Sequence, residues 1–432
     1  MLLVAGAGLL AAPVVYADDA SVVEGPGIPV GEGSVFHPTL GADVGFTNNV
    51  FYEDQTPRMA GLFRLVAEAA LASKKIDDQP IDPMLDAEGE AGTPTSTAAP
   101  KTEFRFGGML RYDEYLSPNA GVRAQRTLGA DLDGGLTMAP QGTFAFSADE
   151  HFVRDTRPTN FEQAYGNQNN RIANNLALAL RYQPGGGMIA GELRWQNQID
   201  FFEQSTTRFA DRMINSLGAR GDWRLFPYTR FLAEFNYSFV NGLGDNMLGG
   251  TEYKRSAQPI RGGLGVQTVL AELVTFKLHV GWAYASYNGG AAYNAPELGA
   301  EFGYQYSPTG RIVAEYAWEH RDSINSDFYR DHRVSGHLDQ QFGARLLASA
   351  RADIRWRTYE GISPAIGVAS RSDFLAAIGV RASYVLKDTF AIVADYHTAI
   401  DQTDFMSIGT GGPGDDPSYI RHEITAGVRA AF

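Results

Sequence analysis

The chain has 432 residues and a formal net charge of -14, with 36 Lys and Arg against 50 Asp and Glu. An acidic balance of this size excludes nucleic acid as the expected partner, because phosphates require a basic surface. The 25 Phe, 20 Tyr and 48 Gly with no Cys suit a chain of alternating β-strands, whose apolar and polar faces average to a low hydropathy.

The beginning of the chain is typical of a secretory signal peptide. An apolar run from Leu2 to Leu10 leads to Val15-Tyr16-Ala17, which has small or branched residues where signal peptidase inspects the chain. The usual Lys or Arg before the run is missing, and the run is shorter than the about 20 apolar residues of a membrane-spanning helix. We predict a signal peptide at 1–17, a mature start at Asp18, and one outer-membrane β-barrel over 18–432.

Most of the chain alternates apolar and polar side chains with a period of two. In 274–287, for example, Leu278 and Val280 alternate with Lys277 and His279, as in a strand between lipid and water. The pattern predicts an antiparallel transmembrane barrel of about 18 strands with both termini periplasmic. The predicted ranges are 34–46, 59–72, 103–116, 122–138, 143–154, 171–183, 188–202, 209–226, 230–240, 258–270, 274–287, 295–306, 311–321, 332–342, 345–358, 371–386, 389–400 and 420–432.

The second of these segments is ambiguous. Residues 61–73 also fit helical spacing, because Leu62, Leu65 and Ala69 share one helical face. We assign the segment as a strand because a barrel with both ends on one side needs an even count.

Short and long connections alternate from about residue 140 to the end, which matches periplasmic turns and extracellular loops. One connection on the short-turn side breaks this rhythm. Residues 74–101 contain six Asp and Glu, no aromatic residue and a run rich in Thr, Pro and Ala. This composition predicts a disordered periplasmic insertion, with a docking segment as the alternative.

The face opposite the apolar one supplies the wall of the lumen, and it is strongly charged. A charged wall must be hydrated, and about 16 to 18 strands leave room for an aqueous channel. The predicted pore-lining residues are Lys277, Glu315, Glu319, Arg351, Asp353, Arg355, Arg357, Arg381 and Asp395.

Three of these residues, Arg351, Arg355 and Arg357, form a basic series on one strand, with Asp353 inside it. Such a series can attract an anionic solute, for example an acidic sugar or phosphate. In the alternative interpretation, the arginines pair with carboxylates on neighbouring strands and only line the wall, as is common for charges that face a wide, wet lumen.

The last predicted strand ends with an aromatic residue. Ile424, Val428 and Phe432 share its apolar face. A terminal aromatic on such a strand resembles the C-terminal signal of bacterial outer-membrane barrels. We therefore predict that Phe432 is the assembly signal and that the barrel-assembly machinery is a partner.

Signals for catalysis and for bound metal are weak. His320, His332 and His337 are close in sequence, but no HExxH motif or Cys pair accompanies them. Asp415-Asp416 fits an ordinary polar turn better than a calcium loop. No Ser-His-Asp set is identifiable, so the sequence predicts no enzyme, no catalytic residue, no metal and no cofactor.

The layout resembles the β-barrel porin families of diderm bacteria, including the Wzp-type barrels associated with exopolysaccharide export. The resemblance is carried by 36–52, by 316–323, by Tyr329-Arg330-Asp331-His332-Arg333 and by Phe432. It covers most of the mature chain, although its motifs are diffuse.

The resemblance implies an outer-membrane pore that passes a hydrophilic polymer, most readily polysaccharide. Some similar exporters carry an N-terminal helical-repeat domain, and this chain has no room for one. A periplasmic polysaccharide-export protein is then expected as a separate partner, beside outer-membrane lipid. The alternatives are a general or anion-preferring porin for small solutes and a plugged barrel with a structural or adhesive role.

Overall fold

The computed structural model describes residues 23, 25–30, 34–73, 101–155, 162, 170–185, 187–204, 207–243, 247–248, 251–252, 256–288, 290–324, 326–362, 370–405 and 417–432. The predicted signal peptide, the mature start at Asp18 and residues 74–100 of the acidic insertion lie outside these ranges.

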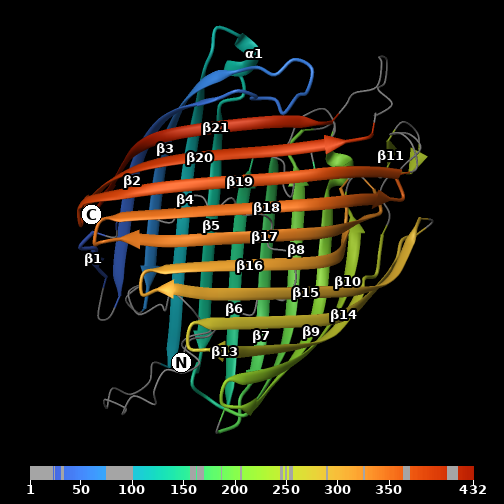
Figure 1. The fold of residues 1–432 in the computed structure, drawn as a ribbon. Helices are drawn as coiled ribbons and strands as arrows, with labels where there is room; N and C mark the ends of the chain where they lie inside the picture. Colours follow the sequence, from blue (N-terminus) through green and yellow to red (C-terminus); the bar gives the residue numbers. More distant parts are fainter. Residues whose placement is uncertain are drawn as a thin grey trace.

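The described chain forms a closed antiparallel β-barrel (Figure 1). Eighteen long strands each pair with the next long strand, and the last, β21 (Tyr419–Ala431), pairs with the first, β2 (Val35–Thr47). The others are β3 (Ala60–Ala72), β4 (Thr102–Leu116), β5 (Thr127–Met138), β6 (Phe144–Asp155), β7 (Arg171–Tyr182), β8 (Ile189–Phe202), β9 (Arg212–Phe226), β10 (Thr229–Gly242), β13 (Ile260–Ala271), β14 (Val274–Ser286), β15 (Ala292–Ser307), β16 (Gly310–Asp322), β17 (Phe328–Phe342), β18 (Leu346–Glu360), β19 (Ser370–Lys387) and β20 (Phe390–Thr403). The predicted fold class and strand count are confirmed.

The strands are strongly tilted. In Figure 1 the strands of the near wall, such as β17 and β18, cross those of the far wall, such as β6 and β7, at a steep angle. Closing a sheet into a barrel requires such a tilt.

Five short elements complete the described structure. They are β1 (Ile28–Pro29), which pairs with β2, the two-stranded hairpin of β11 (Met247–Leu248) and β12 (Thr251–Glu252), the helix α1 (Ala120–Arg123) and the 3₁₀ turn η3 (Arg208–Ala210). Among the described residues, no helix is long and apolar enough to cross a bilayer.

Four predicted strand starts are wrong by three residues or more, and one ambiguity is resolved. Two are too late, since 295–306 starts at Ala292 and 332–342 starts at Phe328, and two are too early. The range 122–138 began too early, because the Asn119 side chain accepts hydrogen bonds from the backbone N–H groups of Gly121 and Val122 and so caps α1. Likewise 209–226 began inside η3, and the strand starts at Arg212. The helical alternative for 61–73 is excluded, since β3 occupies this segment.

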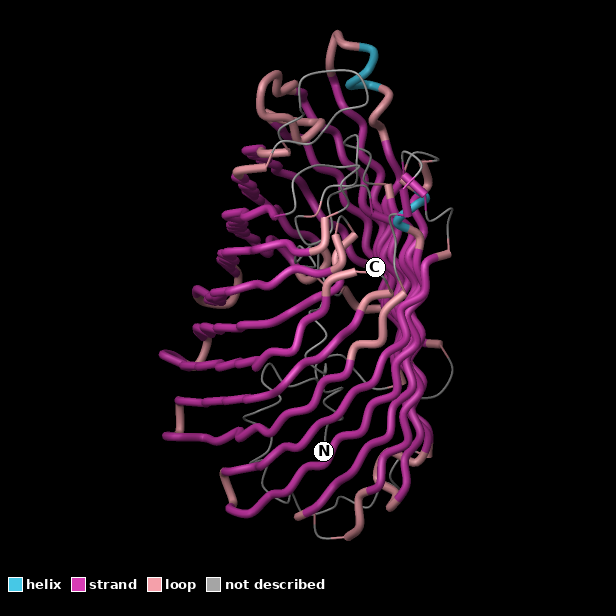
Figure 2. The backbone as a smooth tube through the Cα atoms, turned by 90° about the vertical axis from the view of Figure 1, so that its right-hand side faces the viewer, coloured by secondary structure: helices cyan, strands magenta, loops and turns pink. Residues whose placement is uncertain are grey.

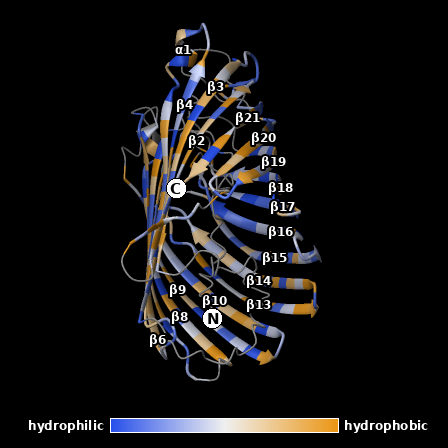
Figure 3. Cartoon of the chain, turned by 90° about the vertical axis from the view of Figure 1, so that its left-hand side faces the viewer, coloured by the Kyte–Doolittle hydropathy of each residue, from blue (hydrophilic) through white to orange (hydrophobic). Residues whose placement is uncertain are grey.

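The outer face of the barrel is apolar. Val44 on β2 and Val280 on β14 expose 64% and 53% of their surface. On the other face, their sequence neighbour Asp43 pairs with Arg429, and His279 lies 2.9 Å from Glu234. Figure 3 shows the same alternation as hydrophobic and hydrophilic residues that follow one another along the strands. A closed barrel with an apolar exterior satisfies its backbone internally and exposes hydrocarbon-compatible side chains, as a bilayer requires.

The two ends of the barrel differ. Tight connections such as 227–228, 272–273 and 388–389 lie at one end, together with the start of β2 and the end of β21. The connection between β3 and β4 is also at this end, and the other long connections are at the opposite end. Figure 2 shows neighbouring strands joined by short hairpins along one edge of the barrel.

Candidate functional site

Strands β17, β18 and β19 bring a layer of Arg and Asp together on the lumen side. In the register of these strands, Asp331 faces Arg357, and Arg357 in turn faces Asp373. Alternate residues of a strand share a face, so Arg333, Asp353 and Arg355 point the same way as these three. The charged layer therefore results from strand register and not from neighbours in sequence.

Within this layer, three guanidinium groups share two carboxylates. Arg357 donates to both oxygens of Asp331 at 2.8 Å, and Arg355 Nη1 lies 3.7 Å from the same carboxylate. The Asp353 carboxylate accepts hydrogen bonds from Arg355 at 2.5 Å and from Arg333 at 2.7 Å. We call these five residues the β17–β18 charge cluster. The five residues carry one more positive than negative charge. Their short N–O distances are those of charge-assisted hydrogen bonds.

Aromatic rings continue the layer toward the end with the long connections. The Arg357 guanidinium lies 3.8 Å from the centre of the Tyr329 ring and 5.6 Å from that of Tyr359. Arg371 lies 4.8 Å from the Tyr359 ring centre and 5.6 Å from that of Phe405. These distances are in the range of cation–π contacts, which hold both arginines flat against the wall.

A similar arrangement stands on the opposite wall. Asp200 on β8 is nearly fully buried and lies 2.7 Å from Arg171 and 2.8 Å from Arg212. The lumen is therefore lined on two sides by arginines whose charge is largely balanced by buried aspartates.

Side chains from opposite walls meet at the end with the long connections. An apolar cluster joins Phe202, Phe209 and Ala210, around the β8–β9 connection, to Ile324, Tyr329, Tyr359, Ile362 and Phe405. The strands β8 and β17 are not neighbours in the sheet, so this contact crosses the lumen. The cluster narrows the passage on that side.

Glu162, between β6 and β7, makes a second contact across the lumen. Its carboxylate accepts hydrogen bonds from Ser323 Oγ at 2.5 Å and from Ile324 N at 3.3 Å. Burial raises the pKa of Glu162, and the positive charges of Arg357 and Arg212 partly oppose this.

The predicted pore-lining residues lie on the lumen side of their strands, and most form ion pairs with neighbouring side chains. Arg355, Arg357 and Asp353 belong to the β17–β18 charge cluster, and Glu315 lies 3.9 Å from Arg333. The remaining pairs are Lys277–Glu301 at 2.9 Å, Glu319–Arg321 at 2.6 Å and Arg381–Asp395 at 3.6 Å.

Arg351 differs from its neighbours on β18. It is exposed, it faces His337 and Gly379 in the register, and it makes no ion pair within the described part of the chain. Of the basic series named from the sequence, Arg351 is the member whose charge is available to a solute.

Several residues of this site were not among the predicted pore-lining residues. Asp331, Arg333 and Arg371 are on the predicted lumen face, so the two-residue period could have found them. Their pairings depend on strand register, and the aromatic contacts of Tyr329 and Phe405 depend on how the connections fold inward. Across the described ranges, no group of His, Cys, Asp and Glu is arranged to hold a metal ion.

No protein-family model and no curated protein matches the chain. Among solved structures, it is similar to OccAB2 of Acinetobacter baumannii, with 10% identity over 92% of this chain and 98% of that chain and a TM-score of 0.47. It is also similar to Pseudomonas aeruginosa OpdL, with 10% identity, 92% and 98% coverage and a TM-score of 0.43. A third is Pseudomonas aeruginosa OpdK with vanillate, with 8% identity, 93% and 99% coverage and a TM-score of 0.44.

The barrel's own features define its class. Closure removes every sheet edge, the exterior is apolar, and the interior is charged. These are the properties of a bacterial outer-membrane β-barrel, and the predicted localisation follows from them.

Proposed function

We propose that the protein is an outer-membrane channel for small hydrophilic solutes. The observation that carries this proposal is the packing of Phe209 and Ile324 across the lumen, with Glu162 beside them. An eighteen-strand ring leaves room for an aqueous channel, and these contacts narrow it. The charged wall keeps the remaining passage hydrated.

Polysaccharide export, the expectation drawn from the Wzp-type resemblance, is the less favoured candidate. A polymer must thread continuously through the lumen, and aromatic side chains packed from opposite walls oppose this. A separate periplasmic export protein is then not required.

We further propose that the channel prefers anions. The observation behind this is Arg351, which is exposed on the lumen side of β18 and makes no ion pair within the described ranges. The excess charge of the β17–β18 charge cluster itself is offset by Glu315, 3.9 Å from Arg333. A carboxylate- or phosphate-bearing solute would be attracted along this wall, over a Debye length of about 8 Å at physiological salt.

For the orientation, we propose that the tight turns and both chain ends are periplasmic and that the long connections face outward. Bacterial barrels generally have short periplasmic turns and longer extracellular loops. In this orientation Phe432 is on the side from which the barrel-assembly machinery would recognise it.

Liposome swelling with sugars of increasing size tests the proposal. The refolded full-length protein should admit monosaccharides and progressively exclude oligosaccharides, and the double variant Phe209→Ala with Phe405→Ala should admit larger sugars. Phe201→Ala, on the outward side of β8, is the matched control and should leave the size limit unchanged. Entry of long dextrans into liposomes with the unaltered protein would favour polymer export. Absence of swelling for the protein and the double variant would indicate a plugged barrel.

A further inference from the structure

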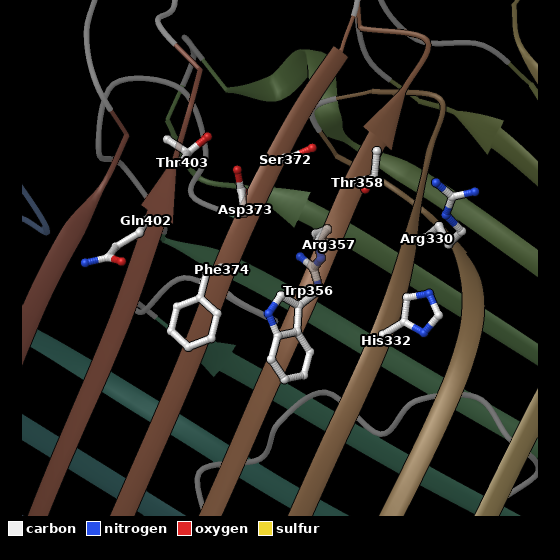
Figure 4. Close-up of a pocket in the computed structure, with 10 residues that line it drawn as sticks. All are labelled: Arg330, His332, Trp356, Arg357, Thr358, Ser372, Asp373, Phe374, Gln402 and Thr403. Atoms are coloured by element: carbon white, nitrogen blue, oxygen red, sulfur yellow. The ribbon is translucent and has the colours of Figure 1, made fainter.

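A pocket lies on the outer face of the barrel, at the ends of β17 to β20 that carry the long connections (Figure 4). It has a volume of about 580 Å³, and the outward side chains that line it include Arg330, His332, Trp356, Thr358, Phe374 and Gln402. In Figure 4 the Trp356 and Phe374 rings stand on the near side of their strands, whereas strands of the opposite wall lie behind them. The pocket therefore opens away from the lumen.

Strand register orders this outer face into three successive rows. The row nearest the middle of the barrel is apolar and contains Val334, Ile354, Ala376 and Ile400. The next contains His332, Trp356, Phe374 and Gln402. The row beyond it is polar and contains Arg330, Thr358 and Ser372. From the hydrocarbon core of a bilayer through the interface to the headgroups, a barrel surface is expected to change from apolar to aromatic to polar. The three rows follow this order, so the pocket spans the membrane interface.

The His332 ring is held in place by its neighbours. It stacks on Trp318, with ring centres 5.6 Å apart and an angle of 7° between the planes. The Tyr316 hydroxyl lies 3.0 Å from Nδ1. If this hydroxyl donates to Nδ1, Nε2 carries the proton and can donate to a ligand. The imidazole is thus prearranged as a donor at the edge of the pocket.

The charges around the pocket are unequal. Arg330 makes no ion pair within the described ranges. The Asp373 carboxylate is bound to Arg371 at 2.7 Å, and the Asp404 carboxylate accepts the Ser372 backbone N–H at 3.0 Å. The exposed Glu360 lies one row further toward the long connections. Among the outward side chains that line the pocket, Arg330 is the one that carries a permanent charge, and this charge is positive.

We propose that this pocket binds the phosphate-bearing headgroup of an outer-leaflet glycolipid. Guanidinium and imidazole groups give phosphate charge-assisted hydrogen bonds, and the Thr358, Ser372 and Gln402 side chains supply neutral donors for sugar oxygens. The acyl chains of the same molecule would lie along the aromatic and apolar rows. The inference rests on the proposed orientation, with the long connections outside.

Lipid binding to the refolded full-length barrel in nonionic detergent tests this site. Native mass spectrometry should show retention of diphosphorylated lipid A in preference to phosphatidylglycerol and phosphatidylcholine. The double variant Arg330→Gln with His332→Gln should bind lipid A about tenfold more weakly, a loss of about 1.4 kcal/mol. Arg126→Gln, which alters an exposed arginine between α1 and β5, should bind as the unaltered protein does. Should the double variant fail to assemble, Ser372→Asp places a negative charge in the pocket and must weaken lipid A binding instead.

Three outcomes would overturn the site. They are equal retention of lipid A by the double variant, equal retention of phosphatidylcholine, and displacement of lipid A by inorganic phosphate, which would indicate a simple anion site. The test is separable from the channel proposal, because the double variant should keep the swelling behaviour of the unaltered protein. Loss of swelling activity with lipid A still bound would count against the channel and not against this site.

Discussion

Arg357 on β18 and Asp331 on β17 are joined by two hydrogen bonds of 2.8 Å, and their side chains are 0% and 1% exposed. Both charges are removed from bulk water, so each is stabilised mainly by the other. Arg357 therefore belongs to the structure of the wall, whereas Arg351, six residues earlier, is exposed.

Arg357→Ala should lower the free energy of unfolding by about 3 to 5 kcal/mol, because it leaves the buried Asp331 carboxylate without its main partner. Arg351→Ala should change it by less than about 0.5 kcal/mol, as is usual for an exposed side chain. Urea titration of the folded barrel in detergent measures both. Similar stabilities for the two variants would contradict the distinction between a structural and an available arginine.

Arg351→Glu should shift ion selectivity toward cations while the barrel still assembles. The effect should be larger at low salt, because screening shortens the reach of the charge. Reversal potentials in a planar bilayer under a salt gradient report it, with Arg351→Gln expected to lie between the two. Selectivity that is unchanged at low salt would show that this position does not influence permeating ions.

The strand pattern was readable from the sequence because lipid and water impose a period of two on every strand. This period predicts which side Lys277 and Val280 face, and it places Asp331 correctly without indicating its partner. Partners depend on the register between strands, which brings Arg357 opposite Asp331 across 26 residues of sequence. The narrowing of the lumen was not predicted, because Phe209 lies in η3, which the two-residue period had included in a strand, and Ile324 lies in a connection.

Val280→Arg should impair assembly, because a charge on the lipid-facing side near the midplane costs about 2 to 4 kcal/mol. The neighbouring lumen position is a poor control, since a side chain at Gly281 would approach the Gly262 carbonyl oxygen to 3.0 Å. Gln196→Arg is better suited, because its cross-strand neighbours Ala177 and Ser216 are small. Heat-modifiable gel mobility compares the two, and equal assembly would refute the assignment of faces.

Deletion of Phe432 should lower the amount of barrel in the outer membrane and leave the stability of the assembled protein nearly unchanged. The side chain is exposed on the outside, and its backbone N–H donates to the Pro38 carbonyl oxygen at 3.1 Å, so the residue contributes little to packing. Cell fractionation and urea titration separate the two effects. Normal membrane levels with reduced stability would mean that Phe432 is structural and not an assembly signal.

The contact between Glu162 and the β16–β17 connection should strengthen in acid. Burial raises the pKa of this carboxyl above its value in a solvent-exposed loop, so the contacting state binds the proton more tightly than the free state does. Acid therefore favours the contact, and the contact weakens as pH rises through the raised pKa.

The chain has no Cys, so the rate at which a thiol reagent labels an Ile324→Cys variant reports how often this contact opens. Dividing this rate by the labelling rate of the exposed Gln125→Cys variant removes the intrinsic pH dependence of the reagent. The normalised rate should increase from about pH 4 to about pH 8 and become independent of pH when Glu162→Gln is added. A pH dependence that persists in the Gln variant would assign the titration to another group.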